Sequence, residues 1–451
     1  MKTSIVKFWF GALLLVVLAA SCRKYVEVQQ YGARTLINTS DYQFLMNNRE
    51  DFKMGYILPT VVNDDMATTT ASHQATWGSE IKNAYIWAEQ YYVQGQMDVG
   101  WNNLYKQIYN CNEVLYGVMS SKNGTEALKR EVYAEALVQR AYAYLMLVNQ
   151  YAEIYNPSTA ATQIGVPLLI TPDLYQPLNR ASLKTIYDRV IMDVEEAVPA
   201  LPNSGTNNGH PDKASAYALL SRAHLYMRNF DLAGEYADKS LALRSTLLNL
   251  RNYSTGNMST FPRSLQDPEI LLFKNTAGTF RSELNPQLLA LFSTGDQRYN
   301  LYTGTQNGVP GRSFVRPNFT YEGIYAGLSV PEVILNRAEA YARAGNVSKT
   351  LEFLNMLREK RFTAATYQPL NIGDVNELLP AVINERRREF VGTGLRWFDQ
   401  RRLNLDPALA NPVSRTFENQ TYTLAPGSNR YIFPIAPGLL DLNPEIQQSP
   451  R

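Results

Sequence analysis

Two stretches of the sequence each contain a pair of amphipathic helices joined by a short turn. Residues 212–243 read DKASAYALLSRAHLYMRNFDLAGEYADKSLAL, with the turn expected at 228–231. Residues 330–361 read PEVILNRAEAYARAGNVSKTLEFLNMLREKRF, with Gly345 and Asn346 at the turn. A short helical hairpin cannot bury its apolar face alone, so hairpins of this kind stack side by side.

Further helices are expected before these hairpins. Residues 98–118 and 126–150 place apolar or small side chains at alternating spacings of three and four, which is the period of one helix face. Ser182 is expected to cap a helix that ends near Ala197, before two prolines. Helical pairs rich in Ala, Leu and Tyr resemble degenerate tetratricopeptide repeats. The sequence therefore predicts a mainly α fold, a tetratricopeptide-like superhelix of helical hairpins with irregular loop excursions and little β structure.

The loop excursions are expected at residues 55–97 and 245–328, which show no helical period. Irregular segments of this length inside a compact protein are usually functional or disordered. Their many aromatic residues argue against disorder. We expect these two segments to form the ligand-facing surface.

The N-terminus is typical of a secreted protein. Lys2 and Lys7 precede an apolar stretch that is too short to span a membrane, and small residues lead directly into Cys22. The sequence LAASC resembles a bacterial lipobox, although Ala19 stands where leucine is usual. We expect a signal peptide at 1–21 and a lipid on Cys22 that anchors the chain to a membrane without spanning it. The alternative is an ordinary secretory signal followed by a chance cysteine.

Charge and motifs exclude several function classes. The chain has 43 Lys and Arg against 41 Asp and Glu, and residues 1–21 contain two lysines and no acid, so the mature side chains balance. Nucleic-acid binders carry a basic excess or patch, so no nucleic-acid partner is expected. Nucleotide-binding, serine-hydrolase and zinc-protease motifs are missing, and His73, His210 and His224 show no metal-ligand spacing. We expect no cofactor, no metal and no enzymatic activity.

Asp64 and Asp65 form an acidic pair in the first irregular segment. Two carboxylates are the catalytic groups of glycoside hydrolases, but neighbouring side chains in an extended loop point apart. A turn stabilised by aspartate side chains bonded to backbone amides is the favoured alternative. A carboxylate that hydrogen-bonds a sugar hydroxyl lies between these two interpretations.

The tryptophans divide into two groups. Trp101 and Trp397 lie in helical patterns and are expected in the core, whereas Trp77 and Trp87 lie in the irregular segment 55–97. Aromatic faces stack on the C–H faces of sugar rings, and planar polar groups bind the hydroxyls. The alternative is that one or both tryptophans pack this segment onto the helices. The candidate glycan contacts are Trp77, Trp87, Asp64, Asp65, Tyr85 and Tyr91.

Residues 385–402, ERRREFVGTGLRWFDQRR, are expected to form an arginine-rich helix and resemble the charged-aromatic run of the SusD/RagB family of outer-membrane nutrient-binding lipoproteins. Thr393 departs from that run, since an acidic residue is common before the glycine. Other family-like pieces occur in the same order as in the family: CRKYVEV, WNNLYKQIYNCNEVL, VPEVILNRAEAYARAGN, YIFPIAP and NPEIQQSPR.

The resemblance implies a lipoprotein at the cell surface that binds an oligosaccharide or polysaccharide and delivers it to a SusC-like TonB-dependent transporter. It also implies that the arginine-rich run forms structural ion pairs with neighbouring acids and is not the ligand site. The mature chain is expected as an N-terminal helical region, 22–244, packed as one unit with a C-terminal region, 245–451, that holds the excursion 245–328, helices within 330–402 and an extended tail. Three alternatives remain: a peptide-binding member of the family, a surface glycoside hydrolase, and a repeat scaffold for a protein partner.

Overall fold

The computed structural model describes residues 36–255, 261–276 and 280–451. Residues 38–451 form one compact unit. The expected signal peptide and the lipidated Cys22 lie outside the described residues. Among the described residues, no helix is both long enough and apolar enough to cross a membrane.

The three helices predicted before the hairpins follow the predicted boundaries closely. Helix α7 (Val99–Gly117) begins after Asp98, whose carboxylate accepts hydrogen bonds from the amides of Gly100 and Trp101. Helices α8 (Glu126–Tyr151) and α9 (Leu183–Ala197) follow, and the Ser182 hydroxyl caps α9 by accepting from the Thr185 amide at 3.1 Å. Such caps satisfy amides that have no partner within the helix. Helix α8 packs against both α7 and α9.

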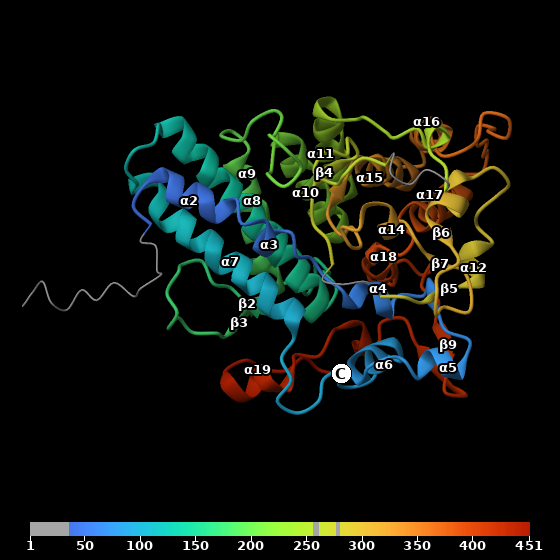
Figure 1. Ribbon diagram of the computed structural model, residues 1–451, viewed down its shortest axis with the longest axis horizontal. Helices are drawn as coiled ribbons and strands as arrows, with labels where there is room; N and C mark the ends of the chain where they lie inside the picture. Colours follow the sequence, from blue (N-terminus) through green and yellow to red (C-terminus); the bar gives the residue numbers. More distant parts are fainter. Residues whose placement is uncertain (1–35, 256–260, 277–279) are drawn as a thin grey trace, which may run out of the picture. The chain divides into compact units, whose positions relative to one another are not determined.

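The two predicted hairpins are both present. They are α10 (Lys213–Tyr226) with α11 (Phe230–Leu243), and α15 (Val330–Arg343) with α16 (Val347–Glu359). Gly345 turns the second hairpin with a positive φ of 69°. Helix α11 packs on α15, which also contacts α17 (Val375–Glu389), so the hairpins stack side by side (Figure 1). The predicted mainly α fold of tetratricopeptide-like hairpins is confirmed.

The arginine-rich run is not one continuous helix, and that expectation is corrected. Helix α17 ends at Glu389, and α18 (Leu395–Leu403) begins after a turn. Gly392 and Gly394 occupy the left-handed region, with φ of 74° and 85°. A Cβ on Gly392 would lie 2.2 Å from the Phe314 ring, so the chain also needs glycine there for space.

The two irregular segments contain short elements that lack a period because each is only a few residues long. The first holds α4 (Leu58–Val62), β1 (Met66–Ala67), α5 (Ala71–Gln74) and α6 (Ser79–Tyr85). The second holds η3 (Leu250–Asn252), β4 (Ile270–Leu272), β5 (Glu283–Leu284), α12 (Pro286–Leu289), α13 (Gln297–Leu301), β6 (Thr303–Gly304), β7 (Ser313–Phe314), α14 (Pro317–Thr320) and β8 (Leu328–Ser329). Antiparallel pairing in the order β1-β5-β7-β6 joins the segments, with Met66 opposite Leu284.

The remaining elements are short. They are α2 (Thr39–Met46), α3 (Arg49–Phe52), η2 (Val118–Ser120), β2 (Ile164–Pro167), β3 (Arg180–Ser182), β9 (Val413–Phe417), β10 (Gln420–Leu424), η5 (Asn429–Tyr431) and α19 (Pro437–Leu442). Strands β2 and β3, β4 and β8, and β9 and β10 form antiparallel pairs. The hairpin β9–β10 lies close to α5 (Figure 1), which brings a C-terminal segment beside the first irregular segment.

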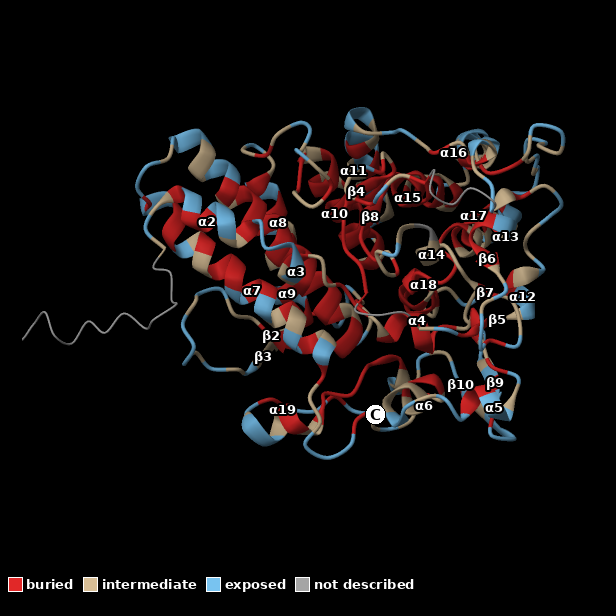
Figure 2. Ribbon diagram, viewed as in Figure 1, coloured by how far each residue is buried: buried red, intermediate tan, exposed pale blue. Residues whose placement is uncertain are grey.

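Buried residues are concentrated where the helices pack together, while exposed residues lie on the outer turns and loops (Figure 2). Trp101 and Trp397 are both buried, as predicted. Trp397 stacks on Tyr431 and Phe433, with ring centroids 5.0 and 5.8 Å apart. The C-terminal tail thereby packs against α18 and fixes its position.

Candidate functional site

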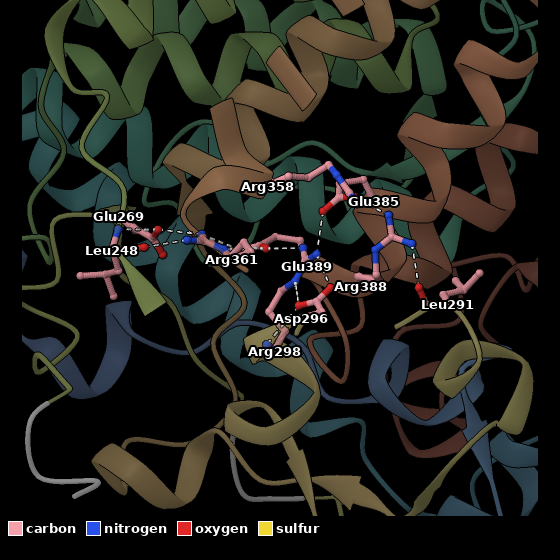
Figure 3. Close-up of polar contacts among 10 residues, drawn as sticks. All are labelled: Leu248, Glu269, Leu291, Asp296, Arg298, Arg358, Arg361, Glu385, Arg388 and Glu389. Atoms are coloured by element: carbon pink, nitrogen blue, oxygen red, sulfur yellow. Dashed lines mark hydrogen bonds and ion pairs between the residues drawn. The ribbon is translucent and has the colours of Figure 1, made fainter. Parts of the chain in front are cut away.

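A network of buried ion pairs crosses the interior at the end of α17. Glu389 accepts hydrogen bonds from Arg361 at 2.8 and 3.0 Å and from Arg298 at 2.9 Å, and Figure 3 shows it between these two arginines. Arg298 also contacts Glu385 at 2.7 Å, and Arg361 contacts Glu269 at 2.7 Å. All five side chains are buried. The expectation that the charged run forms structural ion pairs is confirmed for these groups.

The network continues into α18 with the same chemistry. Asp399 accepts from Arg386 at 2.9 Å and from Arg402 at 2.9 Å, and Arg402 also contacts both oxygens of Glu339. Burial raises the pKa of Asp399, but the two arginines outweigh burial and hold its pKa down to about 2. Arginines likewise outweigh burial and lower the pKa of Glu339. Asp399 and Glu339 are therefore ionised and bound to arginines, which leaves them unavailable to a ligand.

Two arginines of the run point elsewhere and hold the predicted acidic pair. Arg396 donates to Asp64 from Nε at 2.7 Å and from Nη2 at 2.8 Å, and Arg387 donates to Asp65 at 2.5 and 3.0 Å. Burial raises the pKa of Asp64, but Arg396 outweighs it and lowers the pKa below its ordinary value. Burial raises the pKa of Asp65 despite its pairing with Arg387. The favoured backbone-bonded turn is thus replaced by arginine pairs, because α17 and α18 face this turn.

Asp64 lies at the edge of a polar cavity of about 540 Å³, here called the Asp64 pocket. Its polar lining consists of Asp64, Asn285, Gln287, Asn384, Arg387, Arg396, Gln400, Asn404, Asn411, Ser414 and Tyr431. Asn285 Nδ2 donates to the Asp64 carbonyl at 3.0 Å, and Gln400 accepts from the Asp64 amide at 3.1 Å. These bonds fix one wall of the pocket in place.

Other amide groups of the Asp64 pocket are available to a ligand. The side chains of Gln287, Asn384 and Asn411 make no hydrogen bond to any residue that the structure describes. Each carboxamide offers a planar donor and a planar acceptor. Together with the guanidinium edge of Arg396, they form a surface suited to a ligand that carries many hydroxyl groups.

Arg415 in β9 clamps the loop that leads to Asp64. Its guanidinium donates to the carbonyls of Tyr85 and Asn63, both at 2.8 Å, and lies 4.1 Å from the Tyr85 ring and 4.0 Å from the Trp87 ring. Trp87 Nε1 donates to the Val62 carbonyl at 2.9 Å. Tyr85 and Trp87 are only 1% and 4% exposed. Their burial supports the packing alternative, in which they position the loop.

Tyr91 and Trp77 have different surroundings. Tyr91 is 0% exposed, packs near Phe433 and lies under the guanidinium of Arg451. Trp77 is half-buried and belongs to an aromatic cluster with Tyr85, Phe280, Phe417 and His73. Phe280 is also half-buried, 5.2 Å from Trp77 between ring centroids. Of the four predicted aromatic contacts, Trp77 is the one with a partly exposed ring.

The structure brings the predicted residues into one region but divides their surroundings. Asp64 lines the pocket, Trp77 lies in the aromatic cluster, and Tyr85 and Trp87 support the loop between them. Phe280 and Asn285 are five residues apart on the chain, a separation of at most about 17 Å. The half-buried aromatic cluster and the polar pocket are therefore neighbours.

Sequence reasoning missed the amides of the pocket. Gln287, Asn384 and Asn411 come from three separate segments that meet only in the folded chain. The one available signal was the pair Asn404 and Asn411 in the irregular stretch that follows the arginine-rich run. Asn384 lies in α17, whereas Gln287 lies in the four-residue helix α12 and Asn411 lies outside the regular elements, so no single sequence period links the three.

Both halves of the chain match known protein families. Residues 42–225 match a family model described as starch-binding and associating with the outer membrane, and residues 330–451 match the SusD family model. The chain is 20% identical over 381 residues to SusD-like protein P2 of Formosa agariphila, covering 70% of this chain and 74% of that protein.

Solved structures share the fold. A SusD superfamily protein from Bacteroides thetaiotaomicron superposes with a TM-score of 0.75 at 21% identity, covering 92% of this chain and all of that chain. Surface glycan-binding protein A from Bacteroides uniformis gives a TM-score of 0.69 at 18% identity, covering 91% of this chain and 99% of that one. The two family matches, in the order that the motifs predicted, show that the chain belongs to the SusD/RagB family.

Proposed function

We propose that this protein is a non-enzymatic lipoprotein of the outer membrane that binds an oligosaccharide or polysaccharide and delivers it to a SusC-like TonB-dependent transporter. The observation that carries the proposal is the Asp64 pocket, where Gln287, Asn384 and Asn411 present carboxamides without partners among the described residues. A sugar hydroxyl can donate one hydrogen bond and accept another at the same time. It can therefore bind both the NH₂ group and the carbonyl oxygen of a carboxamide, which a ligand group that only donates or only accepts cannot do.

The ligand would extend from the pocket toward Trp77. The half-buried rings of Trp77 and Phe280 offer an apolar edge for a sugar face, and Asn285 continues from there into the pocket. Asp64, held by Arg396, would accept a hydroxyl hydrogen. The other four candidates would not contact the ligand but would hold the loop and the aromatic cluster in place: Asp65, Tyr85, Trp87 and Tyr91.

The pairing of the acids favours binding over hydrolysis. A glycoside hydrolase needs one carboxyl group that stays protonated to act as the acid. Arg396 lowers the pKa of Asp64. Burial raises the pKa of Asp65, but Asp65 is held by Arg387 and lies outside the lining of the pocket, so it cannot act as the acid there. A peptide ligand remains the second candidate, because amides also bind peptide backbone, and the test below includes it.

Membership of the family supports the proposed anchor and the proposed partner. Cys22 would carry the lipid, and the protein would face the cell exterior above a transporter barrel. Membrane extraction of the full chain, followed by copurification, tests both. A large barrel protein should copurify with the wild-type chain, and loss of the lipid in Cys22→Ser should release the protein from the membrane fraction. Failure to copurify any barrel protein contradicts the transporter assignment.

Affinity electrophoresis tests the binding function. Residues 23–451 are run through gels that contain soluble polysaccharides, beside Asn384→Ala, Asn411→Ala and the matched control Asn300→Ala, an exposed asparagine outside the pocket. We expect one glycan to retard the wild type and the control but not the two pocket variants. Equal retardation of all variants contradicts the site. Retardation by no glycan, with binding to an immobilised peptide mixture, would instead favour the peptide-binding alternative.

A further inference from the structure

A second polar cavity lies away from the Asp64 pocket, beside the loop that follows α14. It has a volume of about 570 Å³ and shares no lining residue with the Asp64 pocket. The residues relevant here are Arg49, Lys53, Phe273, Asn275, Tyr321 and Gly323. We propose that this cavity, here called the Tyr321 site, is a second carbohydrate-binding site in which one sugar ring stacks on Tyr321.

Tyr321 is held in an unusual position. Its side chain is 85% exposed, and its backbone is left-handed, with φ of 57° and ψ of 26°. A bulky residue in this conformation is rare, because its Cβ crowds the following carbonyl. The Tyr321 amide donates to the Pro317 carbonyl at 2.9 Å, so the turn that strains the residue also presents its ring to solvent. An exposed aromatic ring fixed by a strained backbone is a feature of functional sites.

The loop around Tyr321 is rigidly attached. The Glu322 carboxylate accepts from the amide and hydroxyl of Ser264, at 2.9 and 2.7 Å. Asn275 Nδ2 donates to the Glu322 carbonyl, while the Asn275 backbone bonds Lys53 and Gly55 at 2.7 Å each. The ring therefore stands at the edge of a preformed cavity, and binding would cost little ordering.

Asn275 supplies the reason for a hydroxyl-bearing ligand. The residue is buried, and its Oδ1 accepts no hydrogen bond from any residue within the described part of the chain. A buried acceptor without a donor is unfavourable. Asn275 Oδ1 has almost no accessible surface in the unliganded chain, so a ligand O–H would gain this hydrogen bond by displacing the atoms that cover the oxygen. Phe273 adds an apolar wall, where it stacks near Tyr325.

The charges around the cavity favour a neutral ligand. Lys53 is paired with Glu50 at 2.6 Å, and Glu322 is occupied by Ser264, so Arg49 is the cation left without an ion pair among the described residues. A single arginine at the rim carries too little positive charge to bind a polyanion. Its guanidinium can still donate a hydrogen bond to a hydroxyl oxygen of a neutral ligand. The carbohydrate class rests on the proposed function, whereas the place of the site rests on Tyr321 and Asn275 alone.

Isothermal titration of the lipidated mature chain in detergent tests the Tyr321 site. The probes are maltohexaose, cellohexaose, xylohexaose, mannohexaose and laminarihexaose, each titrated separately. Tyr321→Gly removes the ring and relieves the left-handed strain, so its fold should be retained or stabilised. Tyr321→Phe keeps the ring, and Tyr175→Ala removes a tyrosine that is 95% exposed and lines neither cavity.

We expect two sites per chain for at least one probe. Tyr321→Gly should weaken one of them about tenfold or more, while Tyr321→Phe and Tyr175→Ala leave both unchanged. If the Asp64 pocket binds no sugar, the titration should show a single site. Its affinity should be weakened by Tyr321→Gly and unchanged by Asn384→Ala. Isotherms of Tyr321→Gly that match the wild type with every probe, or no binding of any probe, would overturn the proposal.

Discussion

Arg396 holds Asp64 through two parallel hydrogen bonds, Nε to Oδ1 at 2.7 Å and Nη2 to Oδ2 at 2.8 Å, between residues 332 positions apart in the chain. Bidentate pairing of this kind fixes the orientation of both groups. It joins the first irregular segment to α18 and sets the wall of the Asp64 pocket. The charged run that marks the family is thus structural along most of its length and meets the proposed ligand site through Arg387 and Arg396.

The buried network should be sensitive to loss of a single partner. Glu389→Gln leaves Arg298 and Arg361 buried without their shared carboxylate, and breaking a buried ion pair in this way costs about 3–5 kcal/mol of unfolding free energy. Urea unfolding measures the loss. The matched control is Asp188→Asn in the exposed pair with Lys184, which should leave the unfolding free energy unchanged. Equal effects of the two substitutions would show that the network carries no special stability.

Acid should destabilise the fold through the same network. The arginines around Asp399 outweigh burial and lower its pKa to about 2, and arginines likewise lower the pKa of Glu385 and Glu389. The unfolded chain therefore binds more protons than the folded chain as the pH falls from about 4 to 2. For Asp399 alone the stability lost is on the order of 2 kcal/mol. Urea midpoints measured at pH 6, 4, 3 and 2.5 should fall steeply below pH 4. A flat profile would contradict the ionised state of these acids.

The break between α17 and α18 should require glycine. Gly392→Ala meets both a positive φ and the Phe314 ring, 2.2 Å from the new Cβ. Gly427→Ala meets a similar φ of 72° with no atom within 4 Å, so it isolates the backbone cost of about 1 kcal/mol. We expect Gly392→Ala to lower the free energy of unfolding by clearly more than Gly427→Ala does, as measured by thermal unfolding. Similar losses for both would mean that the contact with Phe314 relaxes freely.

Cys111 should be unreactive until the chain unfolds. It is a free cysteine with no exposed surface, and burial raises its pKa to about 12. The thiolate is the reactive form, so a thiol reagent at pH 8 should not label folded residues 23–451, in which Cys111 is the single cysteine. Labelling should become complete in denaturant. Rapid labelling of the native protein would show that α7 opens from the core.

Much of the helical framework can be predicted from the sequence, because helix ends and turns are determined by residues that are close together in the chain. The helix that starts after Ser182 and the turn at Gly345 depend on neighbouring residues, so period and caps suffice to predict them. The burial of Trp87 depends on Arg415, which comes from a hairpin near the other end of the chain. No local pattern reports that contact, and for the same reason the amides of the Asp64 pocket were not predicted.

In the irregular segment 55–97, the sequence also does not predict which aromatic side chains are buried. From the sequence, Trp77 and Trp87 are equal candidates for ligand contact or for packing, because both stand in a segment without a helical period. The structure separates them: Trp77 is half-buried, and Trp87 is covered by the guanidinium of Arg415. Sequence separation of ten residues gives no information on which ring faces solvent when the elements between them are single turns.

Hydrogen–deuterium exchange with and without the glycan that retards the protein most strongly tests the central claim directly, namely that glycan binds in the Asp64 pocket. The account predicts slower amide exchange in residues 284–288 and 404–414 when the glycan is present, because these segments line the pocket and lie largely outside long helices. Exchange in α10 and α11 should not change. Unchanged exchange in both pocket segments, with protection confined to other parts of the chain, would contradict the account.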